Sequence, residues 1–257
     1  MKTIGFIGGG RVTRIFLQAF SNAGMALDHI SVYDPNREVL DALKHKFPSI
    51  SINSIALQEV ITADLVFLAV HPPVMMETLA NIKAGINPAA TVVSLAPKFT
   101  IEKIRAILGG IRNIARINPS ASSYINKGVN PVCFAPDIAE DRKAELLDLI
   151  KPLGYSPEVD EPKIEAYAMI SAMGHTYFWF QLQKLKELAI SFGMNHDEAE
   201  TVISEMMHGT VETLFHSGLT YPEVIDLVPI KPLGPVESTI SGFYDDHLIP
   251  LYNKIKP

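Results

Sequence analysis

The sequence has 257 residues and a formal net charge of −6 at pH 7, with 19% charged residues and a single cysteine. This length suits one large domain or two ordinary domains, and it allows a sizeable core without disulfide or metal crosslinks. The acidic balance, without a run of Lys and Arg, argues against a nucleic-acid partner, because phosphate binding requires clustered cations.

The sequence starts on a strand pattern without an apolar leader, so we expect a cytoplasmic protein. Cys133 suits a reducing compartment, and its apolar neighbours predict a buried, unreactive thiol. An uncharged run, residues 166–183, is interrupted by polar side chains and barely reaches the length of a membrane span. We therefore expect no membrane partner.

Short apolar runs typical of strands alternate with helical patterns along the first half of the chain. We expect strands at residues 3–8, 29–34, 49–53, 64–70, 91–96 and 113–118. Apolar strands that alternate with helices form a parallel sheet covered on both faces. The pattern therefore predicts an α/β fold whose doubly wound, dinucleotide-binding (Rossmann) domain spans residues 1–155.

The turn after the first expected strand contains three consecutive glycines and opens a helical pattern. Gly8 and Gly10 fill the first two glycine positions of a dinucleotide-binding turn, and Thr13 stands at the third. These glycines let a pyrophosphate approach the helix N-terminus, here at Arg11 and Val12. A simple tight connection has the same glycines, but the flanking strand and helix favour dinucleotide binding. Thr13 is expected to push the helix slightly away from the strand.

The end of the second expected strand bears on the choice of cofactor. Asp34 stands there, and a carboxylate at this position accepts hydrogen bonds from ribose hydroxyls and repels a 2′-phosphate. Arg37 lies three residues further on, where a guanidinium can bind that phosphate. The sequence therefore predicts NAD(P)H, with a slight preference for NADH.

Helical spacing replaces the strand patterns after residue 162. Residues 163–192 are expected to form one long helix. Two later helices begin at capping-box patterns, in which the N-cap and a Glu three residues on cap each other. These patterns are Asn195 with Glu198, and Thr220 with Glu223. The wide apolar faces of the helices require cover, so residues 156–257 are predicted to form a helical domain that mediates homodimerisation.

The order of these motifs resembles the pyrroline-5-carboxylate reductase family over nearly the whole chain. The resemblance rests on "IGFIGGGRV", "FLAVHPPVM", "ARINPS", "GMNHDEA" and "SGLTYPEVIDLV". It implies a homodimer that uses NAD(P)H to transfer hydride to the C=N bond of a small cyclic imine acid, as in proline biosynthesis. It also implies further cofactor-binding residues at the ends of two strands. These are Ala69, Val70, His71, Pro72 and Pro119.

Two substrate-binding motifs of that family are altered. Residues 171–177 read Ser-Ala-Met-Gly-His-Thr-Tyr where the family has Ser-Gly-Ser-Gly-Pro-Ala-Tyr, and "KPLGPVEST" replaces a loop with paired threonines. We take Ser171, His175 and Thr176 as the candidate catalytic residues of this altered pocket. An imidazole side chain such as that of His175 can both donate a proton and orient a substrate. A hydrogen-bonded core histidine is the alternative interpretation of that position.

Reduction of an imine needs little acid–base help, because an iminium carbon already accepts hydride. The β-hydroxyacid dehydrogenases share this architecture but carry Lys and Asn where this sequence has Phe178 and Gln181, so their chemistry is disfavoured. Two alternatives remain: a related NAD(P)-dependent oxidoreductase with a different imine or carbonyl substrate, and a non-catalytic dinucleotide-binding sensor or scaffold. No residue spacing suits a metal site.

Overall fold

The structure, a computed structural model, describes residues 2–256 and contains two compact units. The first unit comprises the residues up to Met173 together with those from Tyr252 onward, and the second comprises Gly174–Leu251. Within residues 2–256, no helix combines the length and the hydropathy that crossing a bilayer requires.

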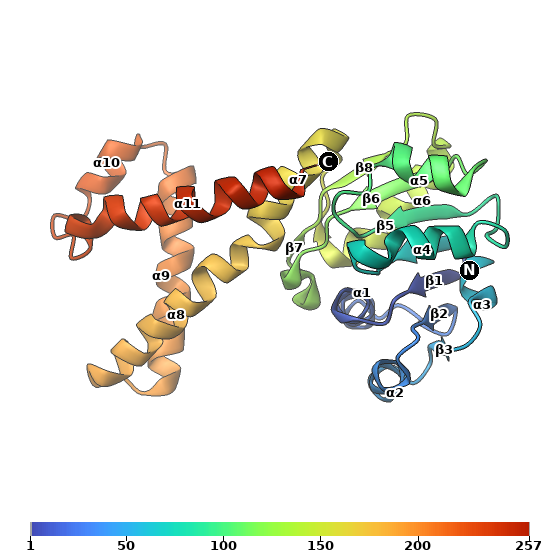
Figure 1. Cartoon of the computed structure of the whole chain (residues 1–257). Coiled ribbons are helices and arrows are strands. Elements are labelled where there is room, and N and C mark those ends of the chain that lie inside the picture. The colour runs from blue at the N-terminus through green and yellow to red at the C-terminus, as the bar shows by residue number, and fades with distance from the viewer. Residues whose placement is uncertain (1, 257) are drawn as a thin grey trace. The chain divides into compact units, whose positions relative to one another are not determined.

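A seven-stranded sheet forms the centre of the first unit, in the order β3-β2-β1-β4-β5-β6-β8 (Figure 1). The parallel strands are β1 (Ile4–Ile7), β2 (Ile30–Tyr33), β3 (Ser51–Asn53), β4 (Leu65–Leu68), β5 (Thr91–Ser94) and β6 (Ile114–Ile117). The edge strand β8 (Val132–Phe134) is antiparallel to β6. Because the chain order reverses between β1 and β4, ligands are expected at the carboxyl ends of these two strands. The predicted doubly wound fold is confirmed.

Two hydrophobic cores cover the two faces of the sheet, since side chains alternate between faces along each strand. Phe6 and Phe67 stack at 4.7 Å between ring centroids in the first core, where helices α1, α2 and α6 pack. Val66 and Leu68 point into the second core, formed with α3, α4 and α5. The helices are α1 (Arg11–Asn22), α2 (Arg37–Lys46), α3 (Gln58–Ile61), α4 (Pro72–Ile82), α5 (Ile101–Leu108) and α6 (Glu140–Ile150).

The single helix predicted for residues 163–192 is interrupted. The chain forms α7 (Ile164–Tyr167), a π-helical turn (Ala168–Ala172) and then α8 (Gly174–Ser191). In the π-helical turn, the Met173 N–H donates to the Ala168 carbonyl at 3.0 Å, one residue beyond α-helical spacing. Ser171 Oγ also donates to the Tyr167 carbonyl at 2.9 Å. The prediction of a continuous helix was therefore wrong. One extra residue in a turn scarcely alters the spacing of apolar residues, so the sequence pattern could not reveal this interruption.

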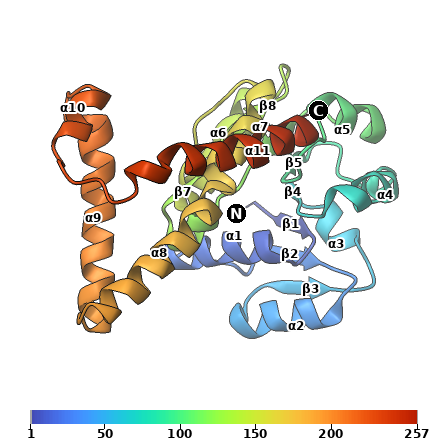
Figure 2. The same ribbon diagram turned by 60° about the vertical axis from the view of Figure 1, so that its left-hand side comes forward.

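The described residues of the second unit form helices and connecting loops (Figure 2). Besides α8, they include α9 (His196–His216), α10 (Tyr221–Asp226) and most of α11 (Glu237–Ile255). The capping box of α9 is confirmed: Asn195 Oδ1 accepts from the Glu198 N–H at 3.0 Å, and Glu198 accepts from the Asn195 N–H at 2.8 Å. At α10, Glu223 likewise accepts from the Thr220 N–H at 2.8 Å.

Candidate functional site

The turn between β1 and α1 requires a glycine at its first position. Gly8 has φ +106°, and a Cβ built on it would lie 2.5 Å from the Ala69 carbonyl oxygen at the end of β4. Its N–H donates to the Tyr33 carbonyl at 2.7 Å. Only glycine accommodates both this backbone conformation and this close approach. The turn is therefore fixed against the ends of two neighbouring strands.

The N-terminus of α1 is open where a dinucleotide would bind. A Cβ on Gly10 would meet nothing within 4 Å, so free space lies beside this residue. Among the described residues, no side chain caps α1 and no acid stands in its first turn, which begins with Arg11 and Val12. The backbone N–H groups of such a helix end attract anions, and a pyrophosphate is the anion this turn accommodates in dinucleotide-binding folds. The residues present fit the cofactor.

Thr13 occupies the third glycine position, in the first turn of α1. It is fully buried, and its hydroxyl donates to the Gly8 carbonyl at 2.5 Å. The side chain thus joins α1 to the glycine turn, which is a role that a third glycine could not have.

Asp34 lies at the end of β2 and connects two turns. Its Oδ2 accepts from the Gly9 N–H at 2.8 Å, and its Oδ1 accepts from the Asn36 N–H at 2.8 Å. An ionised carboxylate has about four acceptor positions, so Asp34 retains room for ribose hydroxyls. Arg37 pairs instead with Asp41 at 2.9 Å on the exposed surface of α2. The guanidinium considered for a 2′-phosphate is therefore engaged elsewhere.

A cavity of about 560 Å³ opens beside the glycine turn, between α1 and α2. Arg11, Arg14 and Lys46 line it, and no carboxylate does. Within the described chain, neither arginine forms an ion pair. Lys46 Nζ donates to the hydroxyl of Tyr124 on the cavity wall, and this hydrogen bond lowers the pKa of Tyr124. Three cations without acidic partners make the cavity suitable for an anion.

The remaining cofactor candidates lie at the same edge of the sheet. Ala69 follows β4, and its N–H donates to the Ile7 carbonyl at 2.8 Å, with Val70 next to it. His71 is the N-cap of α4, and Pro72 occupies the first helical position, which needs no N–H donor. Pro119 follows β6. Residues distant in sequence thus meet at the carboxyl ends of the parallel strands.

Two parts of the chain contain the three candidate catalytic residues. Ser171 lies in the π-helical turn of the first unit, and its carbonyl accepts from Ser120 Oγ at 3.1 Å, directly after Pro119. His175 and Thr176 lie in the first turn of α8, in the second unit. His175 is half-buried and stacks on the Trp179 ring, with 5.7 Å between centroids, whereas Thr176 is exposed.

Among the described residues, neither a reactive thiol nor a group of metal ligands adds to the candidate site. The Cys133 thiol is 2% exposed, and burial raises its pKa to about 12. The thiol is therefore protonated at neutral pH, as the predicted unreactive thiol requires. Within residues 2–256, no three His, Cys, Asp or Glu side chains are grouped so that they could hold a metal ion.

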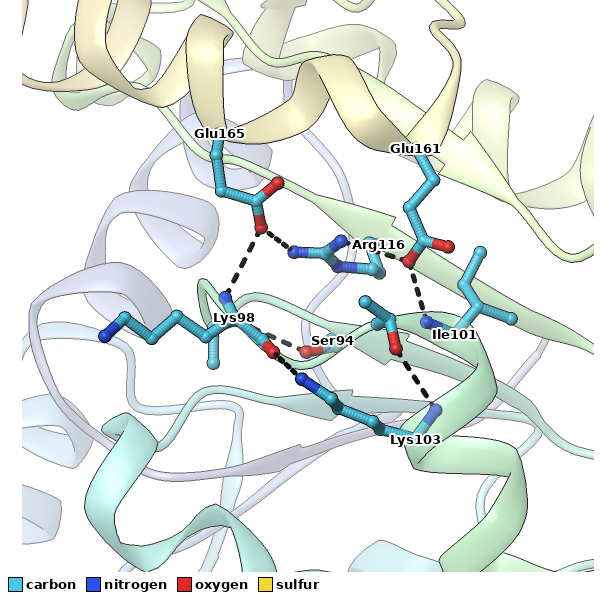
Figure 3. A network of polar contacts seen from close by, with 9 residues as sticks. Ser94, Lys98, Ile101, Lys103, Arg116, Glu161 and Glu165 are labelled. Atoms are coloured by element: carbon cyan, nitrogen blue, oxygen red, sulfur yellow. Dashed lines mark hydrogen bonds and ion pairs between the residues drawn. The ribbon is translucent and has the colours of Figure 1, made fainter. Parts of the chain in front are cut away.

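Sequence reasoning did not select a buried charge cluster around Arg116 on β6, which Figure 3 shows. Arg116 is 2% exposed and pairs with Glu161 and Glu165, which lie in the segment that leads into the π-helical turn. The sequence contained one indication of this cluster, because Arg116 stands within the apolar strand pattern "NIARIN" and a buried charge requires a partner. The partners could not be identified from their own sequence surroundings.

Comparison with known proteins agrees with this architecture. Residues 3–98 match the model of a family described as NADP oxidoreductase, coenzyme F420-dependent. Pyrroline-5-carboxylate reductase of Escherichia coli K12 is 26% identical over 218 residues, which cover 84% of this chain and 81% of that protein. The match spans both the sheet and the helical region.

Two solved structures share the fold over almost the whole chain. Pyrroline carboxylate reductase of Plasmodium falciparum, solved with NADP bound, aligns with a TM-score of 0.77 at 18% identity, covering 99% of this chain and 94% of that chain. A pyrroline-5-carboxylate reductase of Coxiella burnetii aligns with a TM-score of 0.72 at 24% identity and the same coverage. In sequence and fold this chain is therefore similar to the pyrroline-5-carboxylate reductases over most of its length, in agreement with the resemblance of its motifs.

Proposed function

We propose that the protein is an NAD(P)H-dependent reductase that transfers hydride to the C=N bond of a small cyclic imine acid, with pyrroline-5-carboxylate as the first candidate. The observation that carries this proposal is the open glycine turn at the switch point of the sheet, in a chain whose relatives are named pyrroline-5-carboxylate reductases. The proposed location is the cytoplasm, which suits a chain with one cysteine and no internal disulfide.

The protein's own residues supply binding and orientation. The N-terminus of α1 at Gly10 binds the pyrophosphate, and Asp34 accepts hydrogen bonds from the ribose. The bound cofactor supplies the hydride. An iminium carbon needs no further activation, so the remaining requirement is a substrate held in line with that hydride in a dry pocket. We assign this to the Ser171 turn and to His175 and Thr176, where the imidazole holds a proton or a substrate carboxylate.

The test is oxidation of NADH and NADPH in the presence of pyrroline-5-carboxylate, other cyclic imines and 2-oxo acids. Turnover of pyrroline-5-carboxylate above all other compounds supports the proposal. The altered residues 171–177 favour a second candidate, an oxidoreductase with a different imine or carbonyl substrate, which preferential turnover of another compound would establish. Cofactor binding without turnover of any compound would instead indicate a sensor or scaffold.

For the cofactor we propose NADH in preference to NADPH. The negative charge of Asp34 at the ribose position disfavours a 2′-phosphate, and Arg37 is paired with Asp41. The cavity with Arg11, Arg14 and Lys46 is the observation that favours NADPH instead. The affinities for ADP and 2′,5′-ADP decide between the two, since these nucleotides differ in the 2′-phosphate. Tighter binding of 2′,5′-ADP would overturn the preference for NADH.

We also propose that the second unit mediates homodimerisation. Among residues 174–251, only Gly174 and Ala199 are buried. Large apolar side chains in this unit are exposed to between 37% and 78%. Examples are Phe180, Phe192, Phe215, Ile230 and Phe243. A helical unit with so few buried residues lacks a core of its own, and a second copy supplies the missing cover.

A further inference from the structure

The charge cluster of Figure 3 lies outside the residues assigned to the cofactor and the substrate. Arg116 Nη1 donates to Glu161 Oε1 at 3.0 Å, and Nη2 donates to Glu165 Oε1. Arg116 is 2% exposed and Glu165 is 1% exposed, so this pair is fully withdrawn from water. Replacing buried ion pairs with apolar residues of similar size is often neutral or stabilising. Stability alone therefore does not explain why this cluster is present.

The same carboxylates hold the loop between β5 and α5. Glu165 Oε1 accepts from the Lys98 N–H at 3.3 Å, and Lys98 has the left-handed φ of +69°. Glu161 Oε1 accepts from the N–H of Ile101, the first residue of α5, at 2.7 Å. This loop starts at the carboxyl end of β5, on the cofactor edge of the sheet. Arg116 thus orients two carboxylates that fix a loop of the cofactor site.

The segment that carries these carboxylates also carries the Ser171 turn. Its start is held by Arg116, and its end is held where the Ser171 carbonyl accepts from Ser120 Oγ at 3.1 Å. Arg116 lies in β6, and Ser120 lies in the loop that follows β6. Strand β6 and the loop that follows it therefore anchor the two ends of the segment from Glu161 to Ser171.

A small cavity of about 10 Å³ adjoins the cluster, and Arg116, Asn118 and Glu165 are among the residues that line it. Each of these three side chains has one buried polar atom without a hydrogen-bond partner in the described chain. The atoms are Arg116 Nε, Asn118 Nδ2 and Glu165 Oε2, which are two donors and one acceptor. A water molecule accepts two hydrogen bonds and donates to a carboxylate, and a cavity of this size holds about one water.

We propose that Arg116, Asn118 and Glu165 bind one buried water, and that this hydrated ion cluster positions the β5–α5 loop and the Ser171 turn for hydride transfer. Arg116, Asn118 and Glu165 are positioning residues, because they act through the loop and the turn and not on the reacting atoms. The assignment of the water rests on the cavity and its polar atoms alone. The positioning role also rests on the proposed reductase function.

The water site is tested in crystals at a resolution that shows ordered solvent. The wild-type protein should show one water within hydrogen-bond distance of Arg116 Nε, Asn118 Nδ2 and Glu165 Oε2. Asn118→Leu removes one donor and fills the space, so the water should be absent from that variant. Wild-type density without a water between these three atoms would overturn the assignment, whether or not the protein turns over any substrate.

The positioning role is tested by single-turnover hydride transfer with protiated and 4-deuterated cofactor. Asn118→Leu and Glu165→Gln should slow the step by about tenfold or more and raise the deuterium isotope effect, because small misplacements of a hydride acceptor are costly. Cofactor affinity should change much less. Ile82→Ala, at the buried end of α4, serves as the control for a loss of thermal stability.

If the two cluster variants behave like Ile82→Ala at equal folded fraction, the cluster is structural and the positioning role is wrong. Cofactor binding without turnover of any imine or carbonyl by the wild-type protein would overturn both the positioning role and the proposed function. The crystallographic result on the water would still stand in that case.

Discussion

The carboxylate of Asp34 accepts a hydrogen bond from the Gly9 N–H at 2.8 Å, so the residue that ends β2 also holds the glycine turn after β1. In the same position the carboxylate can accept from a ribose and repel a 2′-phosphate. The turn geometry and the proposed cofactor preference therefore depend on one side chain.

Asp34→Asn should separate these two roles. The amide oxygen can still accept from the Gly9 N–H, whereas the amide nitrogen cannot accept from the Asn36 N–H, and the negative charge is removed. We expect the affinity for NADPH relative to NADH to rise on the order of tenfold, which corresponds to about 1.4 kcal/mol of removed repulsion. Fluorescence titration with both cofactors measures the ratio. Asp41→Asn, on the exposed surface of α2, is the matched control, and an equal ratio in both variants would contradict this role.

Two glycines of the turn should respond differently to alanine. Gly8→Ala forces a Cβ to within 2.5 Å of the Ala69 oxygen at φ +106°, so we expect a loss of about 1–3 kcal/mol in unfolding free energy. Gly10→Ala meets nothing within 4 Å, and Gly10 has the ordinary φ of −72°. Its stability should hardly change, whereas cofactor affinity should fall because the methyl enters the space of the pyrophosphate.

Urea unfolding and cofactor titration of both glycine variants check this contrast. If both variants lost the same stability, the cost at Gly8 could not be assigned to its φ of +106° and to the nearby Ala69 oxygen. Unchanged affinity in Gly10→Ala would remove this helix end from the cofactor site.

The features that the sequence predicted depend on residues close together in the chain, whereas the features it did not predict depend on contacts between residues far apart in the chain. The strands were predicted because buried parallel strands are continuous apolar runs, such as residues 64–70, and the glycine turn marks the first connection. The π-helical turn depends on contacts such as Ser120 to Ser171, which sequence periodicity does not contain. The edge strand β8 was missed because it is antiparallel and lies outside the alternation of strands and helices that predicts the parallel sheet.

The same distinction applies to the site. The cofactor candidates follow from the topology, since the ends of parallel strands meet at one edge. The Arg116 cluster does not, because its carboxylates lie 45 and 49 residues away and resemble ordinary surface residues in sequence. A charged residue within an apolar strand indicates that a buried partner exists, but it does not identify which one.

Cys133 should be protected from thiol reagents in the folded protein. With a pKa of about 12, only about one thiol in ten thousand is ionised at pH 8, and the side chain is 2% exposed. Labelling by a chromogenic disulfide should therefore be slow in buffer and fast in denaturing urea. Fast labelling of the native protein would show that the β8 edge opens readily.

The raised pKa of Cys133 also has a pH consequence. Below about pH 9, the ordinary pKa of this group, the thiol is protonated in both the folded and the unfolded state and stability does not depend on it. Between about pH 9 and 12 the unfolded chain loses this proton first, so unfolding becomes easier as pH rises. Cys133→Ala should lack this loss of stability at high pH. The urea midpoint should therefore fall more between pH 8 and pH 10 in the wild-type protein than in Cys133→Ala.

Charged substitutions on the second unit should disrupt self-association. Phe215 is 70% exposed on α9, and Phe215→Glu places a charge on a surface that the proposed dimer covers. Sedimentation velocity should show a wild-type dimer and a shift of the variant toward monomer. Ile55→Glu is the control, because Ile55 is 91% exposed on the first unit. A monomeric wild-type protein, or equal behaviour of both variants, would contradict the dimer.

His175→Ala should lower turnover more than cofactor affinity. The imidazole is half-buried in the first turn of α8 and stacks on Trp179. Its loss would remove the proposed proton donor or substrate contact and leave the glycine turn unchanged. We expect kcat/KM for the imine to fall about tenfold to a hundredfold, within the range typical of positioned acid–base groups. The Kd for NADH, measured separately, should stay within experimental error.

His208→Ala, an exposed histidine on α9, controls for the removal of an imidazole from the helical unit. If kcat/KM falls equally in both variants, His175 acts through the packing of the unit. If kcat/KM of His175→Ala falls alone and the His175→Gln variant restores much of it, a hydrogen bond to the substrate explains the effect. If glutamine does not restore it, the proton on the imidazole is the property that matters, because glutamine can donate a hydrogen bond but cannot titrate.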